Sequence, residues 1–382
     1  MPKSKVALIK CTSYDQEQVN DAFFRAMELL GGHQELIGSA GKIMLKPNLL
    51  SPQEPAKAVT THPAVFTAVA TYFQQNYSNS IIRYGDSAPK GTTVKILETT
   101  GMQSAAAKLG IKNSNFEEKV TLSNPKGNIH KQFTIAKPVA DCDALINIAK
   151  FKTHHLTRIT AAVKNLFGCI PGLMKPEFHV KLPGVKEFSQ MMVELDIFLD
   201  AKLHVIDAIE AMEGNGPNSG NTKKLNCIIV SSDPVAADTV ACKLIGLQAS
   251  RVLTNEIGEK FGLGNMKEIE LVGDDIDQLK DKTFVVQRGV NLSTNVAWKY
   301  RYLKNLISLK PVINTQKCIK CGECISHCPV DPVGVDWSKK SEFPVYNYTN
   351  CIRCYCCQEV CPKGAIDIKT PLTRKIMDKI FS

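Results

Sequence analysis

The most constraining feature of this sequence is a cysteine pattern that occurs twice near its C-terminal end. Residues 318–329 and residues 351–362 both read C-x2-C-x2-C-x3-C-P. Three thiolates spaced by two residues on a tight loop can bind three corners of one cubane, while the fourth cysteine of each copy reaches the other cluster. Two copies of the pattern therefore predict two [4Fe–4S] clusters.

The same rule assigns each cysteine of the pattern to one cluster. The predicted ligands of cluster one are Cys318, Cys321, Cys324 and Cys361. The predicted ligands of cluster two are Cys351, Cys354, Cys357 and Cys328. Paired C-x2-C elements also occur in zinc sites, but the third cysteine, the three-residue gap and the proline have no role in a zinc ribbon. Cys356 is a ninth thiol beside a predicted ligand, and we interpret it as a bystander.

The cluster motifs use only the last part of the 382 residues. We predict three units: an α/β domain over residues 1–290, a linker helix over 291–311, and a bacterial-type ferredoxin-like domain of α+β fold over 312–382. The first unit is long enough to bury a core of its own. Apolar segments of strand length alternate in it with segments of helical period, so we expect a largely parallel sheet with flanking helices.

Charge and cysteine usage narrow the cellular setting. The formal charge of +10 suits anionic substrates or an acidic redox partner, and no basic tail or aromatic-interleaved basic run predicts nucleic-acid binding. Six of the fourteen cysteines lie outside the cluster set, scattered through mainly apolar segments. They predict buried free thiols and a reducing cytoplasm. The N-terminus has no long apolar segment of a signal peptide, and no apolar run is long enough for a transmembrane helix.

Four polar motifs follow predicted strands in the α/β domain. They begin at Lys46, at Gly85, at Lys150 and at Asp207. Open α/β sheets bind ligands in the crevice outside the carboxyl ends of their strands. If the strands are parallel, the four motifs meet at one edge. The predicted substrate-binding residues are Lys46, Asn48, Asp86, Ser87, Thr153, Asn165 and Asn215.

The motif that begins at Lys150 is the richest in reactive side chains. It contains Lys152 and His154, and it precedes a predicted helix, residues 157–167, that carries Lys164. A helix N-terminus with a nearby lysine favours an anion such as carboxylate or phosphate. Lysine or histidine could then protonate a centre that receives electrons. The predicted catalytic residues are Lys152, His154, Lys164 and Glu213.

Plainer interpretations stay open for these residues. Each lysine could be a solvated surface residue, and each histidine could be a hydrogen-bonded residue of the core. Glu213 precedes Gly-Asn-Gly-Pro, which a tight surface turn alone explains. The absence of G-x-G-x-x-G and G-x-x-x-x-G-K-[ST] elements lowers the odds of a nicotinamide or P-loop nucleotide site.

Taken together, the sequence resembles the family called domain of unknown function 362, in its form fused to a ferredoxin module. The resemblance spans nearly the whole chain and includes the extra Cys356. Its segments are Lys46–Leu49, Gly85–Ser87, Phe151–His154, Ala162–Gly168, Glu213–Pro217 and Cys351–Cys357. The resemblance implies an iron–sulfur protein of the cytoplasm, and it leaves the reaction undefined.

The leading hypothesis is an iron–sulfur oxidoreductase. Electrons from a low-potential donor such as ferredoxin or flavodoxin would pass through two [4Fe–4S] clusters to a small substrate, bearing carboxylate or phosphate, in the α/β crevice. One alternative is an electron-transfer subunit whose α/β domain docks a partner enzyme. Another is a redox-sensing or binding protein. A pure carrier does not need a large additional domain with its own polar residues, which favours the first hypothesis.

Overall fold

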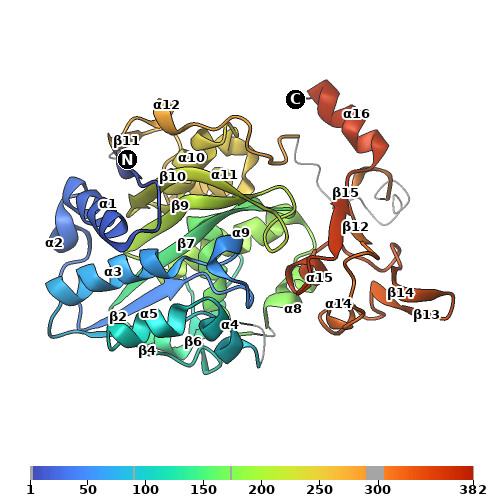
Figure 1. Cartoon of the computed structure of the whole chain (residues 1–382), viewed down its shortest axis with the longest axis horizontal. Helices are drawn as coiled ribbons and strands as arrows, with labels where there is room; N and C mark the ends of the chain where they lie inside the picture. Colours follow the sequence, from blue (N-terminus) through green and yellow to red (C-terminus); the bar gives the residue numbers. More distant parts are fainter. Residues whose placement is uncertain (1–2, 89–90, 173, 290–304, 382) are drawn as a thin grey trace.

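A computed structural model describes residues 3–88, 91–172, 174–289 and 305–381. It shows an α/β part, residues 3–289, and beside it a cluster module, residues 310–381 (Figure 1). Most of the predicted linker helix, residues 291–311, falls on residues 290–304, which lie outside the described residues. Among the described residues, no helix has the length and apolar character that crossing a membrane requires.

A nine-stranded sheet forms the centre of the α/β part. Its main path, in order across the sheet, is β11 (Ile269–Gly273), β1 (Ser4–Lys10), β10 (Asn221–Ser231), β9 (Leu203–Glu213), β7 (Ala144–His154), β2 (Lys42–Pro47), β3 (Ile81–Tyr84) and β4 (Lys112–Asn113). Only the two pairs that contain β10 are antiparallel along this path. The predicted largely parallel sheet is therefore confirmed. A short strand, β8 (Arg158–Thr160), pairs antiparallel with the end of β7.

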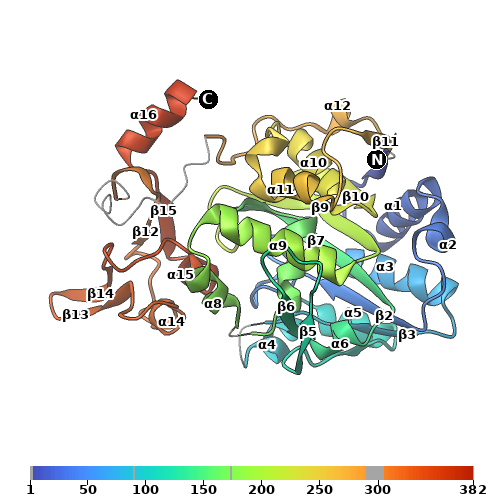
Figure 2. The same cartoon turned by 180° about the vertical axis from the view of Figure 1, so that it is seen from behind.

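Helices cover both faces of this sheet (Figures 1 and 2). One face carries α1 (Gln16–Leu29), α3 (Pro63–Asn76) and α5 (Met102–Lys108). The other carries α9 (Val185–Leu199), α10 (Pro234–Leu244) and α11 (Leu253–Phe261). The shorter helices are α2 (Gly32–Leu36), α4 (Thr93–Thr99), α6 (Lys137–Ala140), α7 (Ala162–Asn165), α8 (Met174–Lys181) and α12 (Ile276–Leu279). Strands β5 (Lys119–Ser123) and β6 (Gln132–Ala136) form a separate hairpin.

Local sequence explains how the longer helices begin. Helix α10 starts where the Asp233 carboxylate accepts a hydrogen bond from the Ala236 N–H at 2.9 Å, with Pro234 as the first helical residue. Both residues suit these positions, because the carboxylate satisfies a free N–H and proline has none to satisfy. Helix α1 begins in the same way at Asp15, and its apolar side chains recur at helical spacing and face the core.

The cluster module consists of short elements. Strands β12 (Lys310–Ile313) and β15 (Ile366–Lys369) pair with each other, and so do β13 (Val335–Ser338) and β14 (Ser341–Tyr346). Its helices are α14 (Glu323–Ser326), α15 (Cys356–Glu359) and α16 (Leu372–Phe381). Helix α15 lies next to α8 of the α/β part in both side views (Figures 1 and 2). The module thus faces the α/β part with the helix that contains Cys356 and Cys357.

Candidate active site

The four polar motifs lie at one edge of the sheet. Strands β3, β2, β7 and β9 are consecutive neighbours and run parallel, so their carboxyl ends point in the same direction. The strands run further than the sequence predicted. Lys46 belongs to β2, Lys150 and Lys152 belong to β7, and Asp207 and Glu213 belong to β9. Side chains that were expected on loops are therefore held by the sheet itself.

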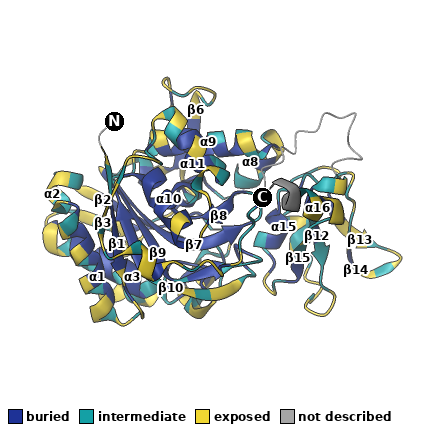
Figure 3. Cartoon of the chain, turned by 90° about the horizontal axis from the view of Figure 1, so that it is seen from above, coloured by how far each residue is buried: buried dark blue, intermediate teal, exposed yellow. Residues whose placement is uncertain are grey.

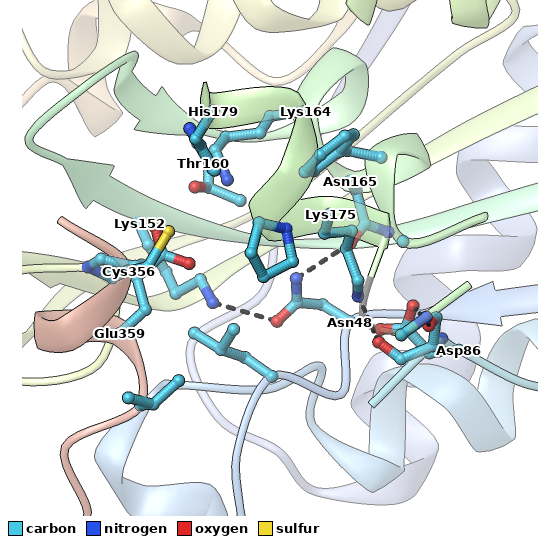
Figure 4. Close-up of a pocket in the computed structure, with 18 of the residues that line it drawn as sticks. Asn48, Asp86, Lys152, Thr160, Lys164, Asn165, Lys175, His179, Cys356 and Glu359 are labelled. Atoms are coloured by element: carbon cyan, nitrogen blue, oxygen red, sulfur yellow. Dashed lines mark hydrogen bonds between the residues drawn. The ribbon is translucent and has the colours of Figure 1, made fainter. Parts of the chain in front are cut away.

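A cavity of about 150 Å³ opens at this edge, between the sheet and the cluster module (Figure 4). Both parts of the chain line it. Its residues from the α/β part are Asn48, Leu50, Asp86, Ser87, Lys152, Thr160, Lys164, Asn165, Phe167, Gly168, Gly172, Lys175, Pro176, His179 and Pro217. Its residues from the module are His327, Cys356, Glu359 and Val360.

Asn48 is the centre of one wall of the cavity. Its amide Nδ2 donates to Asn165 Oδ1 at 2.9 Å, and its Oδ1 accepts from Lys152 Nζ at 3.0 Å. Lys152 Nζ also donates to the Val59 carbonyl at 2.6 Å. Burial, together with the positive charge of Lys164, lowers the pKa of Lys152 well below its usual value. Lys152 is thus a fixed amine that can lose its proton far more readily than a surface lysine.

A buried ion pair supports the cavity from behind. Lys46 Nζ lies 2.8 Å from Asp86 Oδ1, and Asp86 Oδ2 accepts the Leu49 N–H at 2.7 Å. Asp86 borders the cavity, whereas Lys46 does not. Gly168 passes directly over the pair. A Cβ at this position would lie 2.1 Å from Asp86 Oδ1 and 2.6 Å from Lys46 Nζ, so only glycine fits.

His154 and Glu359 join the two parts of the chain at this cavity. His154 Nδ1 accepts the Leu156 N–H at 3.0 Å, which places the ring proton on Nε2, 2.9 Å from Glu359 Oε1. Burial lowers the pKa of His154 to about 3, so the ring is neutral. Burial opposes ionisation of Glu359, but Lys164 and His154 outweigh it and hold the pKa of this carboxyl well below its usual range.

Helix α8 adds two side chains that the sequence analysis did not single out. Lys175 donates to the Ser87 carbonyl, and burial lowers its pKa to about 8. His179 borders the cavity, stacks on Phe188 at 4.3 Å between ring centroids, and has a pKa lowered to about 4 by burial. Lys175 and His179 are four residues apart, which places both on one face of a helix. This spacing was the sequence signal that could have identified them.

The predicted helix over residues 157–167 is wrong. Residues 158–160 form β8, and helix α7 begins only at Ala162. The antiparallel pairing of β8 with β7 provides this backbone with partners that a helix would otherwise supply. The N-terminus of α7 already has a hydrogen-bond acceptor, because the Asp238 carboxyl group accepts from the Ala162 N–H at 2.6 Å and from the Val163 N–H at 3.3 Å. An anion in the cavity must therefore bind to side chains.

Five of the predicted residues lie outside the cavity lining: Lys46 and His154, described above, and Thr153, Glu213 and Asn215. Glu213 Oε2 accepts the Val285 N–H at 2.8 Å. Thr153 Oγ1 donates to the Gly214 carbonyl at 3.1 Å. Asn215 Nδ2 donates to the Ile366 carbonyl of the module at 3.1 Å. The segment 213–217 therefore connects strands and module, and the structure gives Glu213 no place beside Lys152.

The same segment docks the module. Gln358 of α15 is fully buried and donates from Nε2 to the carbonyls of Asn215 and Gly216, at 2.8 Å and 3.2 Å. Asn218 Nδ2 donates to the carbonyl of Cys361 at 3.1 Å. Hydrogen bonds thus hold the backbone around two predicted cluster ligands against the α/β part.

The cysteine loops fit the predicted clusters. A second cavity is bordered by all four predicted ligands of cluster one: Cys318, Cys321, Cys324 and Cys361. No group of three or more His, Cys, Asp or Glu side chains among the described residues forms a site for a single metal ion, and a cubane, with iron at four corners, needs its thiols further apart. The Ala365 N–H lies 3.2 Å from Cys361 Sγ, the type of contact that stabilises a ligating thiolate.

The predicted ligands of cluster two have similar surroundings. The Gly334 N–H lies 3.2 Å from Cys328 Sγ, and the Tyr346 hydroxyl lies 3.1 Å from Cys357 Sγ. Arg353 and Tyr355 have positive φ, which bends the loop between Cys351 and Cys357 tightly. These residues would hold the second cluster. Cys356, next to Cys357, borders the 150 Å³ cavity between the sheet and the module instead.

Comparison with known proteins agrees with this architecture. Residues 310–362 match the 4Fe-4S dicluster domain, which places a 4Fe–4S ferredoxin-type domain at the C-terminal end of an α/β protein. Residues 43–243 match the family described as domain of unknown function (DUF362). The chain belongs to this DUF362 family.

Two individual proteins show how far the similarity extends. The chain is 30% identical over 259 residues to the thylakoid-associated protein sll1697 of Synechocystis sp., covering 68% of this chain and 79% of that protein. Among solved structures, the lactate racemase apoprotein of Thermoanaerobacterium thermosaccharolyticum has a TM-score of 0.42 at 12% identity, covering 64% of this chain. This chain spans 57% of the length of that protein.

Proposed function

We propose that this protein is an iron–sulfur oxidoreductase that reduces a small anionic substrate in the cavity between the α/β part and the cluster module. The observation that carries the proposal is the shared lining of that cavity. Lys152 and Lys164 come from the α/β part, whereas Cys356 and Glu359 come from the helix that also contains Cys357. A substrate in the cavity would therefore contact both a set of proton-carrying side chains and the segment that binds the cluster.

The eight predicted cysteines would hold two [4Fe–4S] clusters, which supply single electrons at low potential when bound. The chain's own residues would position the substrate and control its protons. Lys164 would attract the negative charge of the substrate. Asn48 would orient Lys152, because its side chain bonds both Lys152 and Asn165. Helix α8 and the module residues that line the cavity would cover it and exclude bulk water.

Lys152 is our candidate for proton delivery. A general acid works best when its pKa is close to the working pH, and burial has moved the pKa of Lys152 downward from that of a free lysine. His154 is neutral and donates its only ring proton to Glu359. We assign it the role of holding Glu359 in place at the boundary between the two parts.

The electron donor in this proposal is a low-potential carrier such as ferredoxin or flavodoxin. We place the reaction in the cytoplasm, because the fourteen cysteines, all within the described residues, form no disulfide, as a reducing compartment favours. The Synechocystis relative is described as thylakoid-associated, so a location at a membrane surface is the alternative to test by cell fractionation.

The experiment is anaerobic reconstitution, reduction, and mixing with pools of small metabolites while cluster absorbance is followed. Metabolites that carry carboxylate or phosphate should reoxidise the clusters and yield a reduced product. Lys152→Ala should slow this reaction by about a hundred-fold or more, the usual size of a general-acid effect. Lys181→Gln, an exposed lysine on α8, serves as the control. Reoxidation at the buffer rate with every pool, or full turnover in Lys152→Ala, would contradict the proposal.

A further inference from the structure

One side of the cavity carries polar side chains that have no hydrogen-bond partner among the residues that the structure describes. The hydroxyl of Thr160 is buried and makes no hydrogen bond in the part of the chain that the structure describes. Lys164 Nζ has no hydrogen bond and no carboxylate within 4 Å among the same residues, and the His179 ring has no hydrogen bond there either. The three side chains lie together in Figure 4, on the side of the cavity away from Asp86.

The neighbouring polar side chains of the cavity differ in this respect. Asn48 and Asn165 are bonded to each other, and Lys152 is bonded to Asn48 and to the Val59 carbonyl. Asp86 is paired with Lys46. These groups satisfy one another without a ligand. A buried polar group without a partner costs free energy and calls for an explanation, so the ligand is expected on the side of Thr160.

The charges on that side select the sign of the ligand. The carboxylates that border the cavity are Asp86 and Glu359, and each is paired with its own base, Lys46 or His154. Lys164 helps to lower the pKa of Glu359 by its charge, but among the described residues its ammonium has no carboxylate within 4 Å, so its N–H donors remain open to a ligand. A lysine ammonium, a hydroxyl and an imidazole N–H are all hydrogen-bond donors to oxygen.

We propose that Thr160, Lys164 and His179 form an oxyanion subsite that binds the carboxylate or phosphate group of the substrate. This inference rests on the proposed function, and it separates two tasks within one cavity. The subsite binds and selects the anionic group, while Lys152, the cross-strand neighbour of Thr160 in the β7–β8 pair, acts on the rest of the molecule. A cavity of about 150 Å³ has the liquid volume of on the order of five water molecules, so the substrate class is a small metabolite that carries an oxyanion.

The test is equilibrium binding to the oxidised, cluster-loaded protein, measured by isothermal titration calorimetry. The probes are acetate, inorganic phosphate and acetamide, the last being a neutral analogue of acetate. Acetate or phosphate should bind, and the stronger of the two identifies the group of the natural substrate. Acetamide should bind at least about ten-fold more weakly, because it cannot use the charge of Lys164.

Two variants and a control locate the site. Lys164→Gln should weaken anion binding about ten- to hundred-fold, and Thr160→Val should weaken it about three- to ten-fold, as expected for charged and neutral hydrogen bonds. Lys181→Gln should leave it unchanged. Equal binding of acetate and acetamide, or anion binding that survives in both variants, would overturn the proposal. Thr160→Val keeps the test decisive if Lys164→Gln fails to fold.

The outcome can be separated from that of the proposed function because calorimetry involves no electron transfer. Anion binding that depends on Lys164, combined with no cluster reoxidation by any metabolite, would support the subsite and reject the reductase. Reoxidation by a metabolite at the same rate and half-saturating concentration in Lys164→Gln would reject the subsite and support the reductase.

Discussion

The α/β part and the cluster module are stabilised by different means. In the α/β part, large apolar clusters fill both faces of the sheet, and its central strands β2, β7 and β9 are buried along most of their length (Figure 3). The module's own apolar cluster has four buried residues, Cys357, Cys361, Ala365 and Ile366, two of which are predicted cluster ligands. A domain of this size with so small a core needs a metal or another cross-link.

This difference explains why the two parts interact through polar groups. The α/β part completes its core without the module, so its contact surface can consist of side-chain and backbone hydrogen bonds. The module contributes the predicted cluster ligands and only a small apolar core. The α/β part is therefore stable without the module. The module depends on bound iron and on its contacts with the α/β part.

Removing iron should have the largest effect and should act on one part alone. Metal binding supplies folding free energy when the site is absent from the unfolded chain. After anaerobic chelation, we expect amide hydrogens of residues 310–369 to exchange at least about a hundred-fold faster, because local opening becomes cheap. Amides of β2, β7 and β9 should keep their protection. Hydrogen–deuterium exchange with mass spectrometry measures both, and a protected module in iron-free protein would show that the comparison is mistaken.

A substitution in the core of the α/β part should destabilise that part and leave the module unchanged. Phe66 is fully buried and contacts Tyr84 edge to face, at 5.2 Å between ring centroids. Phe66→Ala should lower the free energy of unfolding of the α/β part by about 3–5 kcal/mol, the usual cost of such a cavity. Urea denaturation followed by circular dichroism measures this change, with exposed Leu372→Ala as control. Iron content per chain should stay the same, and its loss would mean that the α/β part and the clusters are less separable than we infer.

Acid should also destabilise the α/β part, through its buried histidines. Burial lowers the pKa of His204 from 6.5 to about 3. Above pH 6.5 the ring is neutral in both states, but between pH 6.5 and 3 the unfolded chain binds a proton that the native ring does not. Stability is therefore lost as pH falls through this window, by up to about 5 kcal/mol for one such ring. His62 and His179, with pKa values near 4, act in the same direction.

Amide exchange in β9 at pH 7, 6 and 5, corrected for the intrinsic rate, measures this loss independently of iron release. His204→Gln should make the pH dependence shallower, because one of the titrating rings is gone. An unchanged slope in this variant would assign the acid sensitivity to other groups.

The smallest expected effect concerns the contact between the two parts. Asn218 accepts the Ser51 hydroxyl at 2.6 Å and donates to the Cys361 carbonyl at 3.1 Å. Asn218→Ala should weaken docking by about 1–3 kcal/mol, since buried partners lose their hydrogen bonds. Faster exchange at residues 361–369 would report it, with exposed Asn221→Ala as control. If both variants behave alike, the docking depends on other contacts such as those of Gln358.

The sequence predicted features that depend on short-range spacing. The cysteine pattern identified the 4Fe–4S module, and the apolar periods identified the α/β sheet. The meeting of Asn48, Asp86 and Lys152 followed from one general property, that parallel strands end at the same edge. Each of these inferences needed only the local sequence and a rule of topology.

The remainder of the site depends on contacts between distant segments. Glu359 lies within the cysteine motif, where its neighbours gave no reason to expect a partner 205 residues away in His154. The helix predicted over residues 157–167 failed because β7 extends far enough to pair with β8. Glu213 looked reactive in sequence, yet it serves as a backbone acceptor. Side-chain identity indicates what a residue can do, and only tertiary contacts determine what it does.

Helix α15 has four residues, which contribute both to the predicted cluster ligands and to the cavity lining. Cys357 within it and Cys361 just after it are predicted ligands of different clusters, while Cys356 and Glu359 border the cavity. A ligand that needs this wall binds only the form in which α15 is in place, so ligand and iron raise each other's apparent affinity by the same factor. Under the proposed function, chains that lack clusters would therefore bind the substrate more weakly than chains that carry them.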